Sequence, residues 1–312
     1  MKTVLMEPLN ISKELLDILS APLRDGNNTF TAYDTKPATL EEWIARLGDA
    51  DQLILANTPM PEAVLDAAPN LKYINIAFTG TDHVPVAQAE AKGIQVINAA
   101  GYSDEGVAEL VLGMTISLLR RLGEADIALR HGGRAADFLG NEIAGRTVGI
   151  IGTGRIGKRV AQLFAALGAN LIGTNRSEHD DVKAIGLQYV PLDELLHRAD
   201  IITVHLPSTP ETKDFLAARE FAQMKPSAIL INCARGPIVN SADLAQALSD
   251  GLLAGAAVDV FNQEPPLTDG EPLLHAPNTL LTPHIGYFTR EAMIKRAKIV
   301  FAHACAWADG GR

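Results

Sequence analysis

A glycine-rich turn is the strongest chemical signal in the sequence. Gly152, Gly154 and Gly157 follow an apolar run at residues 148–151 and open an amphipathic stretch. In this spacing the first glycine permits a tight turn, the second lets the backbone approach a pyrophosphate, and the third lets a helix pack on a strand. Backbone N–H groups and the positive end of the helix then receive the phosphates. The turn and its flanking elements predict a dinucleotide site.

The residues after the next apolar run bear on which dinucleotide binds. A site that prefers NAD places Asp or Glu there to bind the ribose 2′-hydroxyl, whereas this chain has Asn175 and Arg176. A guanidinium would pair with a 2′-phosphate that a carboxylate would repel. We therefore expect NADP(H) to be preferred over NAD(H), although the acidic residues at 178–181 weaken the argument. The alternative is that Arg176 is a solvated loop charge and that both cofactors are used.

Three reactive side chains each follow an apolar run near the end of a predicted strand. They are Arg235, Glu264 and His284. The carboxyl ends of strands in an open α/β sheet face the ligand crevice, so these residues could meet although they are far apart in sequence. Each one alone is also typical of a surface or capping group. In a chain that also has a dinucleotide-binding turn, the presence of all three favours a catalytic role for them.

Reduction of a 2-keto acid by a nicotinamide cofactor would use such a set. Arg235 offers a planar fork that matches a carboxylate, and His284 can deliver a proton near neutral pH. Glu264, if bonded to the other imidazole nitrogen, would fix the tautomer and raise the histidine pKa. We expect Asp259 to lie nearer the nicotinamide than the substrate.

Short apolar runs that alternate with amphipathic stretches must position these residues. The runs expected to be strands lie at 3–6, 52–56, 73–77, 95–98, 147–151, 170–173, 201–205, 228–233 and 255–260. The stretches expected to be helices lie at 11–19, 40–47, 61–67, 84–92, 107–121, 155–167, 192–198, 241–249 and 290–307. Alternation of this kind predicts parallel sheets covered by crossover helices, and two such series suggest two lobes.

Composition limits the classes of partner. The chain has 312 residues and a net charge of −10, with no block of Lys or Arg, so we expect no binding to nucleic acid. We expect no membrane contact either, because no apolar run is long enough to span a bilayer and the N-terminus lacks a signal-peptide pattern. The two cysteines suit a reducing cytoplasm. The histidines show no metal-ligand spacing, so a metal site is not expected.

The ordered motifs resemble those of the D-isomer-specific 2-hydroxyacid dehydrogenases over essentially the whole chain. The motifs that carry the resemblance begin at Gly149, His205, Asn232, Asp259 and Thr282, and the first lobe adds those that begin at Thr79 and Val107. The resemblance implies two Rossmann-like or flavodoxin-like α/β lobes with a cofactor cleft between them. A substrate domain would comprise residues 1–98 and 286–312, and a dinucleotide-binding domain residues 99–285. It also implies a homodimer built on the cofactor domain, and the composition described above predicts a cytoplasmic location.

The resemblance also assigns residues. It implies catalysis by Arg235, Glu264 and His284, and substrate-carboxylate contacts from Thr79, Gly80 and Arg235. The residues expected to contact the cofactor are Gly152, Gly154, Arg155, Ile156, Gly157, Asn175, Arg176, Ser177, His205, Pro207, Thr212, Cys233, Ala234, Asp259, His284 and Gly286. For His205, a hydrogen-bonded strand-end histidine is an equal alternative. Cys233 is interpreted as a small buried residue against the cofactor rather than a nucleophile.

Departures from the family pattern guide the choice of substrate. Tyr287 and Phe288 stand where small residues are usual, so they either shape the substrate pocket or pack between the lobes. The loop at residues 56–60 has no arginine, which argues against a phosphorylated substrate. We expect glyoxylate or hydroxypyruvate reduction, with a bulkier 2-keto acid or phosphoglycerate as alternatives. A relative that senses dinucleotides as a corepressor is the alternative from another class, and formate oxidation is disfavoured by Glu264.

Overall fold

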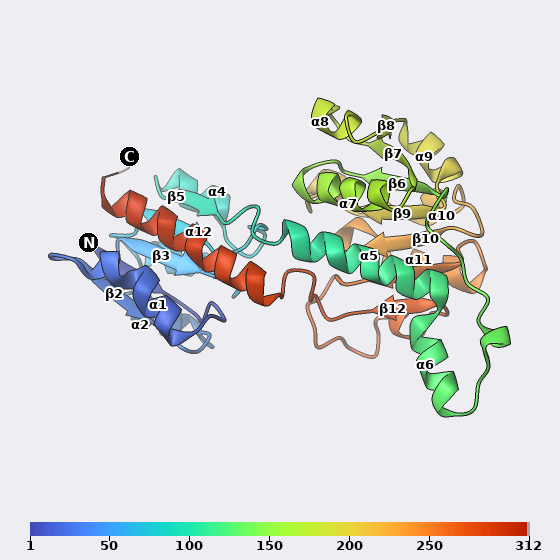
Figure 1. Ribbon diagram of the computed structural model, residues 1–312. Helices are drawn as coiled ribbons and strands as arrows, with labels where there is room; N and C mark the ends of the chain where they lie inside the picture. Colours follow the sequence, from blue (N-terminus) through green and yellow to red (C-terminus); the bar gives the residue numbers. More distant parts are fainter. Residues whose placement is uncertain (311–312) are drawn as a thin grey trace. The chain divides into compact units, whose positions relative to one another are not determined.

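The structure is a computed structural model that describes residues 1–310. It divides into two compact units, unit 1 with Met1–Ser103 and Thr289–Arg312, and unit 2 with Asp104–Phe288. Each unit holds one parallel sheet with helices on its faces (Figure 1), which confirms the predicted α/β class. No helix within residues 1–310 is long and apolar enough to cross a membrane.

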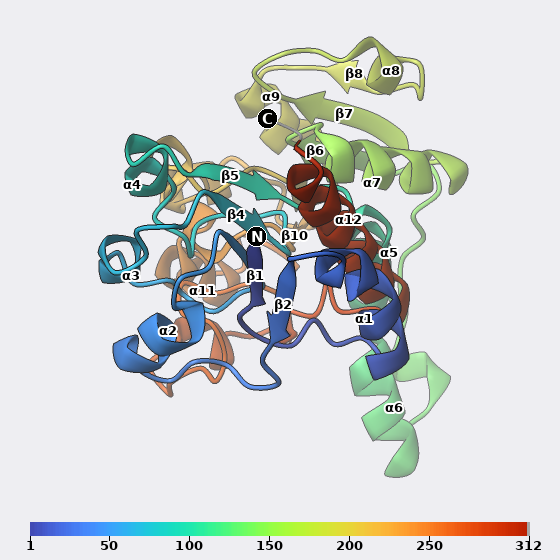
Figure 2. The same cartoon turned by 90° about the vertical axis from the view of Figure 1, so that its left-hand side faces the viewer.

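Unit 1 contains five parallel strands in the order β2-β1-β3-β4-β5. The strands are β1 (Lys2–Leu5), β2 (Thr29–Ala32), β3 (Gln52–Leu55), β4 (Tyr73–Ile76) and β5 (Gln95–Asn98). The helices are α1 (Lys13–Ser20), α2 (Leu40–Leu47), α3 (Ala63–Asp66), α4 (Val86–Ala91) and α12 (Arg290–Ala308). Helices α1 and α12 pack together on one face of the sheet, and α2 and α3 pack together on the other (Figure 2).

The C-terminal helix α12 is part of the core of unit 1. Its residues Met293, Ala297, Val300 and Ala304, which share one face by their spacing of three to four, are all buried. The buried Asn75 amide on β4 also donates to the Val300 carbonyl oxygen at 2.7 Å. The end of the chain therefore returns to the unit in which the chain begins.

Unit 2 contains seven parallel strands in the order β12-β11-β10-β9-β6-β7-β8. The strands are β6 (Thr147–Ile151), β7 (Asn170–Thr174), β8 (Gln188–Tyr189), β9 (Ile201–Val204), β10 (Ile229–Asn232), β11 (Gly255–Val258) and β12 (Thr279–Leu281). The helices are α5 (Asp104–Arg120), α6 (Leu122–Arg130), α7 (Arg155–Ala166), α8 (Asp180–Lys183), α9 (Leu192–Arg198), α10 (Ala218–Phe221) and α11 (Ser241–Ser249). Short 3₁₀ helices in the two units occupy Ala21–Arg24, Ala135–Asp137, Pro210–Thr212, Gly236–Ile238 and Pro272–Leu274.

Both faces of the unit 2 sheet are buried, and successive residues of a strand serve opposite faces. Ile150 packs in the cluster that includes α5 and α7, whereas its neighbour Ile151 packs in the cluster that includes α9, α10 and α11. Leu230 and Ile231 on β10 divide in the same way. This two-sided burial explains why the strands read as continuous apolar runs rather than alternating ones.

The order in which the chain adds strands to the sheet changes direction at β6. From β6 the strands proceed to β7 and β8 on one side, while β9 to β12 lie on the other. The glycine turn at residues 152–154 therefore leaves the sheet between the ends of β7 and β9. Ligands of open α/β sheets bind at such a switch point, outside the carboxyl ends of the strands.

Five of the strands and helices named above were not predicted from the sequence. Strand β2 is an edge strand with no fully buried residue, and β8 has only two residues. Helix α6 has no buried residue, and helices α8 and α10 have only four residues each. Hydrophobic periodicity detects elements that are long enough to repeat and that bury a face, so all five lacked the signal on which the prediction relied.

Candidate active site

The glycine turn has the close contacts that its three roles require. Gly152 has φ +92°, and a Cβ there would lie 2.6 Å from the His205 carbonyl oxygen. A Cβ on Gly157 would lie 2.0 Å from the Gly152 carbonyl oxygen. Both positions therefore exclude any larger residue for reasons internal to the protein.

Gly154 differs because a Cβ built on it meets no atom within 4 Å. It is the N-cap of α7, and no side chain caps the first turn of that helix. Uncapped N–H groups and open space above the backbone fit a pyrophosphate at this helix end. The turn can thus hold the phosphates of a dinucleotide with Gly154, Arg155, Ile156 and Gly157.

A cavity of about 520 Å³ lies beside the turn and is lined by residues from the turn, α7 and the segment after β7. Three cations on its wall are ion-paired, Arg155 with Asp104 at 3.0 Å, Lys158 with Asp181 at 2.5 Å and Arg159 with Glu105 at 2.6 Å. His179 also lines it. The cavity is therefore polar and carries charges of both signs.

The three polar residues after β7 form a short organised loop. The Asn175 amide donates to the Ser177 carbonyl oxygen at 2.8 Å and lies 3.2 Å from His179 Nε2. Arg176 is exposed. The Glu211 carboxyl has a lowered pKa, mainly because the Thr209 side chain hydrogen-bonds to it, and the charge of Arg176 contributes. Arg176 is thus available to solvent and has an acidic neighbour from the loop after β9.

The loop after β9 is held by its own side chains. The Thr212 hydroxyl donates to the Pro207 carbonyl oxygen at 2.7 Å and accepts from the Thr209 N–H at 2.8 Å. His205 Nε2 lies 2.9 Å from the Thr203 hydroxyl, and burial lowers the pKa of His205 to about 3. His205 is therefore neutral near neutral pH. The hydrogen bond to Thr203 is compatible with either alternative for His205, and its cofactor contact remains a prediction.

Arg235 is presented by a turn that follows β10. The buried Asn232 amide donates to the Arg235 carbonyl oxygen at 3.1 Å, and its oxygen accepts from the Ala234 N–H at 3.1 Å. A Cβ on Gly236 would overlap the Phe261 backbone at 2.0 Å, so the turn also packs directly on the next strand segment. Sequence reasoning did not assign this role to Asn232.

Cys233 lies in the same turn, and its thiol has low reactivity. Its sulfur is 3.6 Å from the Met114 sulfur, and its side chain is buried. Burial raises the pKa of the Cys233 thiol well above its ordinary value. Since the thiolate is the nucleophilic form, a raised pKa makes this cysteine a poor nucleophile. Its expected contact with the cofactor remains a prediction.

The buried carboxylate of Asp259 fixes the segment that carries His284. Its oxygens accept from the Thr282 hydroxyl at 2.5 Å, the Ile285 N–H at 2.8 Å and the Gly286 N–H at 2.8 Å. A Cβ on Gly286 would lie 3.0 Å from the same carboxylate, which explains the glycine. The nicotinamide contact expected of Asp259 remains a prediction, whereas this structural role was not foreseen.

Glu264 and His284 form a hydrogen-bonded pair. His284 Nδ1 lies 2.8 Å and 2.9 Å from the two carboxylate oxygens of Glu264. A carboxylate only accepts, so the bond places a proton on Nδ1 and leaves Nε2 to exchange a proton with another molecule. This is the orienting contact that the sequence analysis proposed for Glu264.

Arg235 and His284 follow strands β10 and β12, with β11 between them. The last residues of the three strands lie in register, because Asn232 pairs with Val258 and Val258 pairs with Leu281. Adjacent strands are about 4.8 Å apart, so the two side chains leave the same sheet edge within roughly 10 Å of each other. The structure thus brings together the residues that the sequence separates by almost fifty positions.

In unit 1, Thr79 and Gly80 follow β4 in a loop with its own support. The Asn98 amide donates to the Thr79 carbonyl oxygen at 2.7 Å, which ties the loop to the end of β5. Thr79 is exposed, whereas Phe78 before it is buried beneath the guanidinium of Arg296 at 4.9 Å. The loop therefore begins directly after a buried aromatic side chain, which anchors it to unit 1.

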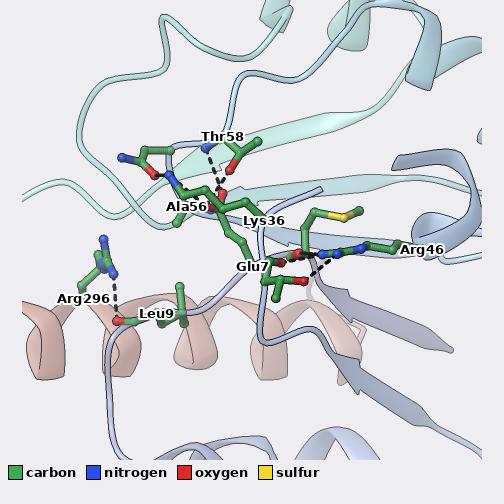
Figure 3. A network of polar contacts seen from close by, with 10 residues as sticks. Glu7, Leu9, Lys36, Arg46, Ala56, Thr58 and Arg296 are labelled. Carbon is green, nitrogen blue, oxygen red and sulfur yellow. Dashed lines mark hydrogen bonds and ion pairs between the residues drawn. The ribbon is translucent and has the colours of Figure 1, made fainter. Parts of the chain in front are cut away.

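A buried carboxylate organises the neighbouring loop at residues 56–60. Glu7 Oε1 accepts from the Ala56 N–H at 3.0 Å and the Thr58 N–H at 2.9 Å, and Oε2 accepts from the Thr58 hydroxyl at 2.7 Å (Figure 3). Lys36 adds a cation that donates to the Asn57 side chain at 2.9 Å and lies 3.9 Å from Glu7. This loop has no arginine, but Lys36 brings a positive charge to it from another segment.

Comparisons with known proteins identify the group to which the chain is similar. Residues 112–286 match the family model described as D-isomer specific 2-hydroxyacid dehydrogenase, NAD binding domain. A glyoxylate reductase of Thermofilum pendens is 34% identical over 98% of this chain and 90% of its own length. A glycerate dehydrogenase of Methylorubrum extorquens is 39% identical over 88% of each chain. A D-3-phosphoglycerate dehydrogenase of Methanocaldococcus jannaschii is 38% identical over 84% of this chain but only 50% of its own.

Solved structures give the same result. An acyclic imino acid reductase in complex with NADPH and D-Arg superposes with a TM-score of 0.89 at 26% identity, over 99% of this chain and 97% of its own. A D-lactate dehydrogenase of Aquifex aeolicus complexed with NAD and lactic acid superposes with a TM-score of 0.87 at 28% identity, over 99% and 96%. Relatives of this fold therefore include proteins with either nicotinamide dinucleotide.

Two glycine substitutions separate folding from phosphate binding. Gly157→Ala is expected to lower the melting temperature, because its methyl group would overlap the Gly152 carbonyl oxygen. Gly154→Ala meets no protein atom, so it should leave the melting temperature within a few degrees while weakening dinucleotide binding about tenfold or more. Calorimetry measures both quantities. Undiminished cofactor binding by a folded Gly154→Ala variant would contradict the assignment of the turn.

Proposed function

The chain belongs to the D-isomer specific 2-hydroxyacid dehydrogenase family, and from that premise we propose that it reduces glyoxylate or hydroxypyruvate with NADPH as the preferred cofactor. Its class is that of an NAD(P)-dependent D-2-hydroxyacid dehydrogenase. The observation that carries the proposal is the Glu264–His284 pair, which stands on the same sheet edge as Arg235 and the glycine turn. Two relatives that are similar to this chain over most of their own length are named glyoxylate reductase and glycerate dehydrogenase, and these names support the two substrates.

The proposed mechanism assigns one task to each catalytic side chain. A bound nicotinamide would supply the hydride that adds to C2 of the keto acid. His284 donates the proton on Nε2 to the developing C2 alkoxide, and takes it back in the reverse reaction. Glu264 keeps Nδ1 protonated throughout and stabilises the imidazolium when the ring carries both protons.

Arg235 binds the substrate carboxylate with its guanidinium fork, and the backbone of Thr79 and Gly80 is proposed to contribute hydrogen bonds to the same group. Asn232 supports Arg235 by fixing its turn. In this proposal unit 1 is the substrate domain and unit 2 the dinucleotide domain. The cofactor contacts expected from the sequence would come from the strand ends of unit 2.

The test of this function follows oxidation of the reduced cofactor in the presence of glyoxylate or hydroxypyruvate. We expect turnover that His284→Ala lowers by roughly 10²–10⁴-fold in kcat and that Arg235→Ala lowers mainly through a higher KM. His197→Ala, at an exposed histidine on α9, is the matched control and should change neither constant. A His284→Ala variant with normal kcat would show that the proton comes from elsewhere.

The NADPH preference depends on Arg176. Its guanidinium is exposed just after the end of β7. The residue before it is the neutral Asn175, at the position where an NAD site usually has a carboxylate that accepts a hydrogen bond from the ribose 2′-hydroxyl. Arg176→Ala is expected to raise the KM for NADPH about tenfold through loss of a charge-assisted contact, and to leave the KM for NADH unchanged. Lys183→Ala, which removes a nearby exposed cation, is the control. Equal kcat/KM for NADPH and NADH in the unaltered protein would refute the preference.

Lys36 favours a second candidate function, in which the substrate carries a phosphate. The sequence disfavoured such a substrate because the loop at residues 56–60 lacks a cation of its own, whereas the Lys36 ammonium lies on Asn57 of that loop. Strand β3, which precedes the loop, pairs with β4, which precedes Thr79 and Gly80. A second anionic group on a substrate held by those two residues would then lie within reach of Lys36.

Lys36→Met tests the second candidate. If it is correct, the KM for 3-phosphohydroxypyruvate rises about tenfold or more while the KM for glyoxylate stays within a factor of two, because only the former has a charge to lose. Lys36→Arg, which keeps the charge, should retain most of the difference. Equal effects of Lys36→Met on both substrates would exclude a phosphate contact at this residue.

We also propose that the protein is a homodimer built on unit 2. The segment around α6 exposes large apolar side chains that a single copy leaves in water, Leu122, Ile127, Leu129 and Leu139, of which Leu139 is 93% exposed. Exposed apolar side chains mark an interaction surface when they form a contiguous patch, and we propose that these four do. Sedimentation at micromolar concentration decides between dimer and monomer.

A further inference from the structure

An aromatic ring packs against the imidazole of His284. The ring centroids of His284 and Tyr287 are 5.3 Å apart, and the two planes are nearly perpendicular at 86°. Edge-to-face pairs of aromatic rings prefer this range of distance and angle. Tyr287 in turn contacts the ring of Phe288 at 5.8 Å. The catalytic histidine is therefore held from a second direction besides Glu264.

The bond to Glu264 alone leaves the imidazole one freedom of movement. It restrains only Nδ1, so coupled rotations about the Cα–Cβ and Cβ–Cγ bonds can still tilt the ring and displace Nε2. The Glu264 side chain is itself 68% exposed, so little packing restrains it. A proton donor must be held within about half an ångström of its productive position. A second contact on the ring is needed to meet that tolerance.

The backbone places Tyr287 where it can supply this contact. His284 adopts φ +56°, a left-handed conformation that is uncommon for residues other than glycine. Asp259 holds the two following amides, those of Ile285 and Gly286. The chain therefore turns sharply at His284, and the side chain three residues later returns onto the imidazole. Such outliers persist only where the surroundings fix them, and they concentrate at functional sites.

We propose that Tyr287 is a positioning residue for His284. Its ring blocks the swing of the imidazole and keeps Nε2 directed at the oxygen on C2 of the substrate, while Glu264 keeps Nδ1 protonated. The contact that matters is made by the ring and not by the phenol hydroxyl. The inference rests on the function proposed above, in which His284 donates the proton.

Three variants test this role. Tyr287→Leu removes the ring, Tyr287→Phe keeps it without the hydroxyl, and Leu274→Ala removes an apolar side chain of unit 2 that is 43% exposed and has no assigned role. With glyoxylate and the better cofactor, we expect Tyr287→Leu to lower kcat about tenfold with a KM within a factor of two. Tyr287→Phe should restore kcat to within a factor of two, and Leu274→Ala should leave it unchanged.

A second measurement does not depend on turnover. Carbon-13 relaxation of the His284 Cε1–H bond reports the order of the imidazole in the resting protein. We expect its order parameter to be high in the unaltered protein and in Tyr287→Phe, and to fall in Tyr287→Leu. An unchanged order parameter in Tyr287→Leu would overturn the proposal, as would a Tyr287→Phe variant as slow as Tyr287→Leu. If the unaltered protein reduced no 2-keto acid, the proposed function would fail, while the order parameters would still decide whether Tyr287 holds the ring.

Discussion

The structure of the candidate site depends on one buried carboxylate. Asp259 is 1% exposed and accepts hydrogen bonds from a hydroxyl and two backbone amides of the segment at residues 282–286. Hydrogen bonds to a charged group contribute about 1.5–3 kcal/mol each, and a buried charge is tolerated only when it is bonded in this way. The bonds hold His284 in its left-handed conformation. Glu264 and Tyr287 can then approach the imidazole from two directions.

A parallel sheet supplies the frame for this carboxylate and for the other site residues. Because both faces of the sheet in unit 2 are buried beneath helices, its strands cannot shift without exposing apolar side chains. The glycine turn, Arg235, Asp259 and His284 all leave the sheet at its carboxyl edge, the end at which such sheets bind ligands. The strands thus carry the reactive groups at fixed positions. Hydrogen bonds of Asn232, Thr212 and Asp259 fix the conformation of the loops that follow the strands.

In unit 1 as well, polar side chains hold loops at the carboxyl edge of the sheet by hydrogen bonds to the backbone. The buried Glu7 holds two amides and a hydroxyl of the loop after β3, and Asn98 holds the loop after β4. In both units, then, a polar side chain bonded to the backbone of a neighbouring loop sets the form of the sheet edge. Such bonds are specific because an unpaired buried carboxylate or amide would be costly. The sheet edges are therefore more sharply defined than loops held by apolar contacts alone.

The sequence by itself determined the class of fold and the glycine turn of the dinucleotide-binding domain, and it singled out Arg235, Glu264 and His284 as the candidate catalytic residues. These features depend on local signals, since apolar runs, glycine spacing and residue types at strand ends can all be read along the chain. Only the tertiary structure decided that Asp259 holds the histidine segment, that Lys36 brings a charge to a loop without one and that Tyr287 packs on His284. The edge strand β2 and the exposed helix α6 were likewise invisible to hydrophobic periodicity. The physical reason is that these contacts depend on strand order and on the direction of individual side chains, which no pattern along a single chain specifies.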